Sequence, residues 1–164
     1  MLIDPTVSPN IIVTPLRYLV CADIQNSSTT ALRMACIKAR MRKGVVDILH
    51  VLEPLESESL FGATDKIRAE RENAAKSVLL LLSKTAEEIT GTKPNLLLKE
   101  GLIGDIIVKV AADTGANMLV LGVEAGSSRG KLVAWLASQL GVRLWTPMML
   151  IPTNLSDAQM LEIS

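Results

Sequence analysis

The sequence is poor in aromatic residues, which make up 2% of its 164 positions. Rings on which nucleic-acid bases or sugars could stack are therefore nearly absent, and we expect backbone and aliphatic side chains to hold any ligand. The 17 Lys and Arg residues equal the 17 Asp and Glu residues in number. Since the chain carries no net charge, we expect neither nucleic acid nor an anionic membrane surface as a partner.

Cysteine is also scarce, because only Cys21 and Cys36 are present. Two cysteines are too few for the disulfide framework of a small secreted domain and suit a reducing compartment. The first ten residues lack the basic region and apolar run of an export signal, and no apolar run approaches the length of a membrane span. We therefore expect a cytoplasmic protein with no membrane partner.

What the sequence does contain is an alternation of short apolar runs with longer helical patterns, which is typical of βαβ units and a parallel sheet. Five β-rich runs predict strands, at 18–22, 45–51, 95–99, 118–121 and 147–151. Four helical patterns predict helices, one with apolar positions from Ala31 that ends at Gly44 as its C′ glycine, and three at about 64–90, 103–114 and 131–140. Gly115 is expected to cap the third.

The longest predicted helix shows one apolar stripe, made of Ile67, Ala74, Ala75, Val78, Leu82, Ala86 and Ile89. The chain is about one domain in length, and 49% of its residues are hydrophobic, enough for a core of its own. We expect an N-terminal arm at 1–16 that includes Ile11-Ile12-Val13, a domain at 17–152 and a C-terminal tail at 153–164. Within the tail, Ser156 and Gln159 match a capping box, which predicts a short helix.

The ligand crevice of an open parallel sheet lies beyond the carboxyl ends of its strands, where the strand order reverses. Two orders are open, 3-2-1-4-5 and 2-1-3-4-5. The segment after strand three, 100–104, is short and apolar, whereas the loop from Gly122 to Gly130 holds three glycines, two serines and a cation. Such a loop can turn backbone N–H groups toward an anion. The comparison favours the order 3-2-1-4-5, with a crevice between strands one and four.

Several residues have a second, purely structural interpretation. The segment from Gly126 to Lys131 is one residue short of a phosphate-binding P-loop, and Leu132 replaces its hydroxyl residue, so we expect no true P-loop, although Arg129 or Lys131 could still meet a phosphate as a point charge. The single histidine, His50, lies in an apolar strand with no nucleophile to serve and no metal-ligand cluster around it in sequence. We expect neither an enzyme nor a metal site. Asp23 fits a helix cap and a ligand site equally well.

Three segments resemble the first, second and fourth strands of the universal stress protein family: Tyr18-Leu-Val-Cys-Ala-Asp23, Ile48-Leu-His-Val-Leu-Glu-Pro54 and Leu119-Val-Leu-Gly122. The resemblance covers about 17–152. It implies an α/β fold with an open five-stranded parallel sheet of order 3-2-1-4-5 and helices on both faces. It also implies an adenine nucleotide, ATP first, as a regulatory ligand, with Mg²⁺ only alongside it, and a homodimer formed through the strand Pro147 to Ile151.

ATP-binding members of that family carry the motif G-x2-G-x9-G-[ST] after the fourth strand. Here Gly122 fits its first glycine and Ser138 its hydroxyl residue, while Ala125 and Ala137 stand where the motif has glycine. The resemblance implies a nucleotide site formed by Ala22, Asp23, Val51, Leu121, Gly122, Gly126, Gly130 and Ser138. The alternative is a dimeric interaction module of the same fold that signals without any nucleotide.

Overall fold

The computed structural model describes residues 15–23, 27–55, 64–124, 126–127 and 129–164. Five parallel strands form one sheet in the order β3-β2-β1-β4-β5, which confirms the predicted order and fold class. The strands are β1 (Arg17–Ala22), β2 (Val45–Leu52), β3 (Asn95–Glu100), β4 (Met118–Val123) and β5 (Met148–Pro152). At the centre of the sheet, Val20 pairs with Ile48 of β2 and with Val120 of β4.

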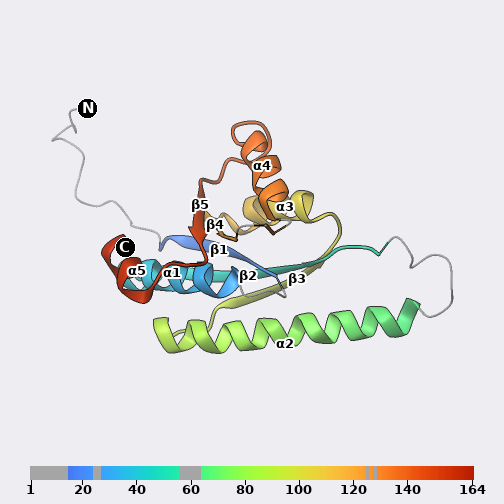
Figure 1. Cartoon of the computed structure of the whole chain (residues 1–164), viewed down its shortest axis with the longest axis horizontal. Coiled ribbons are helices and arrows are strands. Elements are labelled where there is room, and N and C mark those ends of the chain that lie inside the picture. The colour runs from blue at the N-terminus through green and yellow to red at the C-terminus, as the bar shows by residue number, and fades with distance from the viewer. Residues whose placement is uncertain (1–14, 24–26, 56–63, 125, 128) are drawn as a thin grey trace.

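Helices cover both faces of this sheet (Figure 1). One face carries α1 (Ser27–Arg42) and α2 (Thr64–Thr90), and the other carries α3 (Ile103–Thr114) and α4 (Arg129–Gln139). A short helix, α5 (Asp157–Glu162), follows β5 and contacts α1. Because each crossover places a helix on a face of the sheet, the central strands are apolar on both sides.

The alternation of side chains along β1 divides the interior into two cores. Tyr18 and Val20 point into the core beneath α1 and α2, whereas Leu19 and Cys21 point into the core beneath α3 and α4. All four side chains are buried. A strand has a period of two residues, so a run with no polar position can fill both cores at once.

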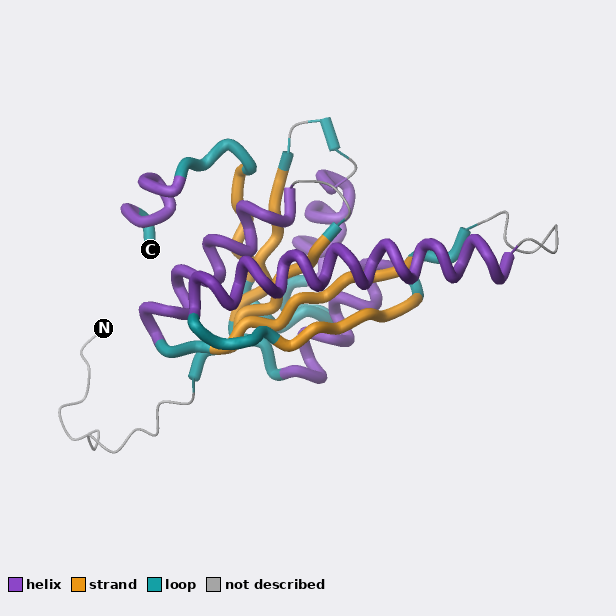
Figure 2. Tube along the Cα trace, turned by 90° about the horizontal axis from the view of Figure 1, so that it is seen from below, coloured by secondary structure: helices purple, strands orange, loops and turns teal. Residues whose placement is uncertain are grey.

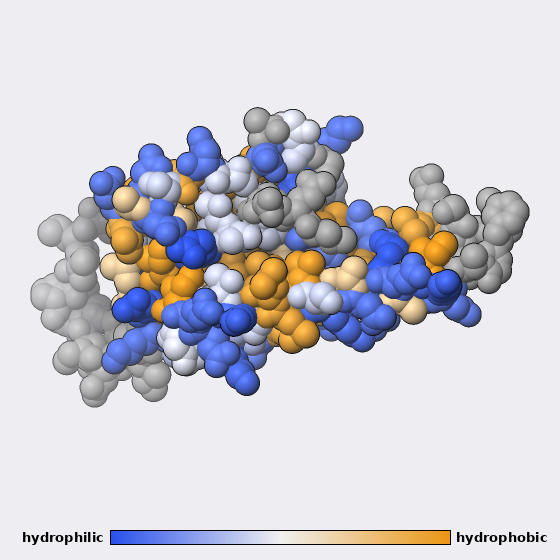
Figure 3. All heavy atoms as spheres, turned by 60° about the horizontal axis from the view of Figure 1, so that its bottom comes forward, coloured by the Kyte–Doolittle hydropathy of each residue, from blue (hydrophilic) through white to orange (hydrophobic). Residues whose placement is uncertain are grey.

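The long helix α2 has the predicted bounds and most of the predicted apolar stripe. Five of the seven predicted residues are buried in the core or packed against it, namely Ala75, Val78, Leu82, Ala86 and Ile89, whereas Ile67 and Ala74 are exposed. Ala75, Leu79, Leu82 and Ala86 are its buried residues, at helical spacing. Ile67 is exposed, because the N-terminal turns of α2 extend beyond the strands that the rest of the helix covers (Figure 2). Apolar side chains also gather on the outer side of α2 (Figure 3), where Leu80 and Leu81 are exposed.

The end of α1 differs from the prediction in one residue. The left-handed conformation that ends the helix belongs to Lys43, whose φ is 51°, and not to Gly44. Gly44 is needed for a different reason, since a Cβ at this position would lie 2.6 Å from the carbonyl oxygen of Leu16. Gly115, at φ 66°, caps α3 as predicted.

The C-terminal segment folds back onto the body of the domain. Ser156 and Gln159 form the predicted capping box at the start of α5, and Met160 is buried in the core beneath α1. The edge strand β5 leaves Leu150 43% exposed. Residues 11–13 of the expected N-terminal arm lie outside the described residues. Among the described helices, none combines the length and apolarity that a membrane crossing requires.

Candidate functional site

A cavity of about 670 Å³ lies at the carboxyl ends of β1 and β2, beside the N-terminal turns of α3 and α4. This volume is in the range of small-molecule sites. The cavity lies at the carboxyl ends of the strands, as the rule for open parallel sheets predicts, but over β1 and β2 and not between β1 and β4, since no residue of β4 lines it. The lining combines aliphatic side chains, one indole and charges of both signs: Ala22, Asp23, His50, Val51, Leu52, Glu53, Arg71, Leu102, Ile103, Gly104, Asp105, Ser127, Arg129, Lys131, Leu132 and Trp135.

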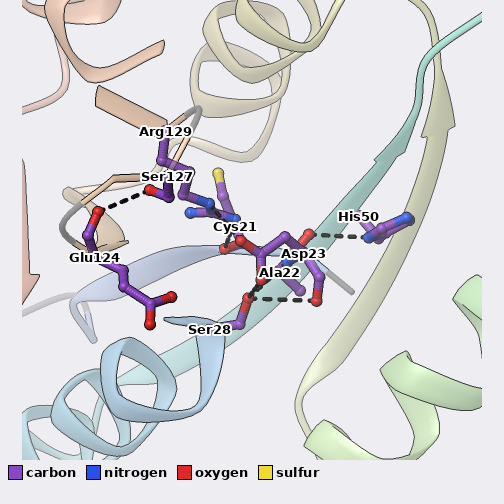
Figure 4. Close-up of polar contacts among 8 residues, drawn as sticks. All are labelled: Cys21, Ala22, Asp23, Ser28, His50, Glu124, Ser127 and Arg129. Carbon is purple, nitrogen blue, oxygen red and sulfur yellow. Dashed lines mark hydrogen bonds and ion pairs between the residues drawn. The ribbon is translucent and has the colours of Figure 1, made fainter. Parts of the chain in front are cut away.

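Asp23 is held from two helices directly after the end of β1 (Figure 4). The Ser28 hydroxyl, in the first turn of α1, accepts from the Asp23 backbone N–H at 2.6 Å and donates to Asp23 Oδ1 at 2.7 Å. Arg129, the first residue of α4, places its Nε 2.7 Å from Asp23 Oδ2. Asp23 therefore hydrogen-bonds to the first turn of α1 and also lines the cavity.

Arg129 is the most deeply buried charge in the lining, at 6% exposure. Besides the ion pair with Asp23, its Nη2 donates to the carbonyl oxygen of Cys21 at 3.0 Å. Its Nη1 is buried and has no hydrogen-bond partner among the described residues. A buried N–H on a charged group is costly to leave unbonded, so this nitrogen marks a place where an acceptor is missing.

Burial and the nearby charges of Arg129 and Asp23 shift the pKa of the Cys21 thiol. Desolvation raises the pKa of its thiol to about 12, although the charge of Arg129 acts in the opposite direction. The thiol is therefore held in its neutral form near pH 7, whereas the thiolate is the reactive form.

His50 lines the cavity with a ring whose tautomer follows from its contact. Its Nδ1 lies 2.9 Å from the carbonyl oxygen of Ala22, on the adjacent strand. A carbonyl oxygen only accepts, so Nδ1 carries the hydrogen, and in the neutral ring Nε2 is an acceptor. His50 thus joins the ends of β1 and β2, and it brings an acceptor to a site otherwise rich in charged groups.

Trp135 supplies the aromatic surface that the composition did not lead us to expect. Its ring lies against Gly104 in the first turn of α3, so closely that a Cβ on Gly104 would be 2.5 Å from Cζ3 of the indole. The guanidinium of Arg143 lies over the same ring, 5.8 Å from its centroid. A half-buried indole in the cavity wall can pack against a planar ligand.

Glu53, which directly follows β2, also lines the cavity and contacts both α3 and α2. Glu53 Oε1 accepts from the backbone N–H of Ile103 at 3.1 Å, and so caps the start of α3 with a carboxylate. The carbonyl oxygen of Glu53 accepts from Arg71 Nη2 of α2 at 2.7 Å. The N-terminal end of α3 is therefore already occupied by an anion that the chain itself provides.

The structure brings three of the residues predicted for the site to this cavity: Ala22, Asp23 and Val51. The other five do not line it. Leu121 and Gly122 are buried within β4, Gly126 and Gly130 are exposed, and Ser138 is exposed near the end of α4, where its hydroxyl donates to the Trp135 carbonyl oxygen. Nine residues of helix, about 13 Å, separate Ser138 from the cavity end of α4.

The loop differs from its prediction at both ends. Strand β4 continues through Val123, and α4 begins at Arg129 and not at Lys131. Within the shortened connection, the Ser127 backbone N–H and hydroxyl both bond to the Glu124 carbonyl oxygen, at 3.3 and 2.9 Å. Gly126 has φ 77°, the left-handed conformation that favours glycine. The two Ser127 donors are thus used within a turn. Arg129 instead lines the cavity and is paired with Asp23.

Sequence reasoning named Arg129 only as one of two cations able to meet a phosphate, and it missed Trp135. The available signal was spacing, because both lie on the first turns of α4, at i and i+6, close to the loop that was singled out.

For the described residues, no group of three or more His, Cys, Asp or Glu side chains could hold a metal ion.

Comparison with protein-family models matches residues 16–152 to the universal stress protein family. Comparison with curated proteins finds no match. Among solved structures, a universal stress protein from Lactobacillus plantarum matches with a TM-score of 0.69 and 14% identity, over 83% of this chain and 97% of that one.

Two further matches were solved with a nucleotide. A universal stress protein family protein from Arabidopsis thaliana with AMP bound has a TM-score of 0.61 and 17% identity, over 85% of this chain and 93% of that one. The universal stress protein from Archaeoglobus fulgidus in complex with dAMP has a TM-score of 0.58 and 18% identity, over 85% and 99%. At these identities the likeness establishes a shared fold.

Proposed function

This chain belongs to the universal stress protein family, and on that premise we propose that it binds an adenine nucleotide as a regulatory ligand in the cytoplasm. The site is the cavity at the carboxyl ends of β1 and β2. The observation that carries the proposal is Asp23, which the fold holds at the mouth of the crevice between Ser28 and Arg129. Two relatives of the same fold were solved with AMP and dAMP.

The lining suits the separate parts of such a ligand. Val51 and Trp135 offer an aliphatic and an aromatic wall for a purine, and the acceptor Nε2 of His50 suits the exocyclic amine of adenine. Asp23 is 25% exposed and can accept from ribose hydroxyls. Arg129 and Lys131 supply positive charge for phosphate. Each part of an adenine nucleotide therefore has a chemically matched group in one cavity.

We infer a binding role without rapid turnover. His50 hydrogen-bonds to the Ala22 carbonyl oxygen and to no hydroxyl or thiol among the described residues, and the thiol next to Arg129 is held neutral by a pKa raised to about 12. A hydrolase would need a base within hydrogen-bond reach of water and substrate. The adenine nucleotide would then be retained and sensed; the sequence led us to expect ATP, with Mg²⁺ entering only as its counterion.

We further propose that the protein acts as a homodimer paired through β5. That strand is at the edge of the sheet and leaves Leu150 43% exposed, with Trp145 just before it 79% exposed. An uncovered apolar edge favours pairing with another strand. The same surface supports the alternative function, an interaction module that signals without a nucleotide, so ligand binding must be measured directly.

Calorimetric titration of ATP, AMP and GMP into nucleotide-free protein tests the proposed function. We expect saturable heat with the adenine nucleotides and at least tenfold weaker binding of GMP. Val51→Trp fills the cavity and should abolish the heat, whereas Val142→Trp adds the same side chain at a site 68% exposed and outside the lining and should not. No heat at millimolar adenine nucleotide would leave the interaction module as the better account.

A further inference from the structure

We propose that Arg129 is the phosphate-binding residue of this site, and that it selects a ligand with a single phosphate group next to the ribose, such as a nucleoside monophosphate. This inference rests on the proposed function and specifies its ligand. The site would then recognise phosphate through a buried side chain and not through the backbone of a glycine loop.

The guanidinium of Arg129 has one free place for an acceptor. Its Nε is engaged with Asp23 and its Nη2 with the carbonyl oxygen of Cys21. Nη1 is buried, lacks a hydrogen-bond partner among the described residues and belongs to a side chain that lines the cavity. A phosphate oxygen could bond to Nη1 while the other two contacts stay in place. The ion pair with Asp23 keeps the guanidinium rigid, which favours binding because little side-chain freedom is lost.

The described residues of the loop before α4 do not offer an equivalent site. The described glycines of this region, Gly122, Gly126 and Gly130, do not line the cavity. The Ser127 N–H already bonds to the Glu124 carbonyl oxygen. Among the described residues of the loop and the first three residues of α4, those that line the cavity are Ser127, Arg129 and Lys131. In this chain the Arg129 side chain would therefore bind the phosphate, in place of the backbone N–H groups of a glycine loop.

The charges around the cavity limit how many phosphates can follow. Three cationic residues, Arg71, Arg129 and Lys131, face three acids, Asp23, Glu53 and Asp105. Glu53 already occupies the N-terminal end of α3, and Asp105 is paired with Arg143 at 3.1 Å. A phosphate monoester carries about two negative charges near neutral pH. Arg129 already shares its charge with Asp23, so Lys131 is the cation that offsets most of this added charge. Further phosphates would add charge that the lining does not offset, and they would be repelled by its acids.

Titrations of adenosine, AMP and ATP into the unmodified protein test the selection without any variant. A hydrogen bond to a charged group contributes about ten- to a hundredfold in affinity. We expect AMP to bind tighter than adenosine by that factor, and ATP to bind no tighter than AMP, with or without Mg²⁺. Binding of ATP more than tenfold tighter than AMP, or equal binding of adenosine and AMP, would overturn the inference. If none of the three binds, the proposed function itself fails.

Arg129→Gln assigns the effect to the residue. The ratio of AMP to adenosine affinity should fall to within about threefold of one, while adenosine binding persists. Arg33→Gln makes the same change at a surface pair with Asp157 outside the cavity and should keep the ratio. If Arg129→Gln does not fold, Arg129→Gln with Asp23→Asn removes both charges and is read by the same ratio. An unchanged ratio in the folded variant would overturn the inference.

Discussion

The ring of Trp135 rests on the backbone of Gly104, where a Cβ would lie 2.5 Å from Cζ3 of the indole. The contact joins α3 to α4 and fixes one wall of the cavity. It requires glycine for space, since no left-handed conformation is recorded at Gly104.

Gly104→Ala should therefore destabilise the fold by about 1–3 kcal/mol, because the methyl group displaces the indole. The expected loss opposes helix propensity, which by itself favours Ala over Gly by up to about 1 kcal/mol. Gly130→Ala is the matched control, since nothing lies within 4 Å of a Cβ added there, and it should be neutral or stabilising. Urea unfolding measures both. Equal effects of the two substitutions would contradict the packing described for Trp135.

The two cysteines should be inert at neutral pH in the folded protein. Burial raises the pKa of both Cys21 and Cys36 to about 12, against a usual value near 9. Because the thiolate is the reactive form, we expect a disulfide-exchange reagent at pH 8 to label neither thiol until denaturant is added. Rapid labelling of either thiol in the native protein would show that its surroundings are open to solvent.

The same raised pKa values make stability fall at alkaline pH. Above about pH 9 the unfolded thiols ionise while the folded ones stay protonated, so each contributes full stability below that pH and loses it progressively up to about pH 12. The slope is at most about 1.4 kcal/mol per pH unit for each thiol. Unfolding midpoints between pH 9 and 11 should fall less steeply for Cys21→Ala/Cys36→Ala than for the unmodified chain. Parallel slopes would contradict this account.

The proposed dimer predicts a specific sensitivity of the edge strand. Leu150→Arg places a charge on the exposed side of β5 and should convert the dimer to monomers in sedimentation equilibrium. Leu81→Arg is the control, because Leu81 is 67% exposed on α2, away from the edge strand, and its change should leave the dimer intact. An unmodified chain that is already monomeric, or a Leu150→Arg variant that stays dimeric, would rule out pairing through β5.

Tryptophan fluorescence can report on the cavity, because the chain has two tryptophans in contrasting places. Trp135 lines the cavity, whereas Trp145 is 79% exposed and outside it. AMP should therefore change the emission of Trp145→Phe by about as much as that of the unmodified protein. It should leave the emission of Trp135→Phe unchanged. A response that follows Trp145 would place the ligand elsewhere.

The strands and their order could be predicted because each depends on local patterns. Buried parallel strands are nearly continuous apolar runs, and the left-handed cap at Gly115 depends only on its own helix end. The choice of order came from comparing two loops after the strands, and it was correct. The strands and the cap at Gly115 are set within a few residues of the chain, whereas the strand order needed the comparison of two separate loops.

The site was harder to predict because it depends on which side chains meet across the fold. The loop motif placed Ser138 at the phosphates, but an unbroken α4 carries Ser138 to the other end of the helix. Arg129 is held in the cavity wall by Asp23, which is distant in sequence. Trp135 is placed there by packing against Gly104, where no side chain blocks the ring. Such pairs have no periodic signal in a single sequence.

The crystal structure of the protein with AMP is the most direct test of the central claim, that the cavity beside β1 and β2 is the nucleotide site. We predict a purine between Val51 and Trp135, the ribose hydroxyls at Asp23, and a phosphate oxygen within hydrogen-bond distance of Arg129 Nη1. A nucleotide bound with its phosphate on the backbone of Gly126 to Gly130, with Arg129 Nη1 still unbonded, would contradict the claim.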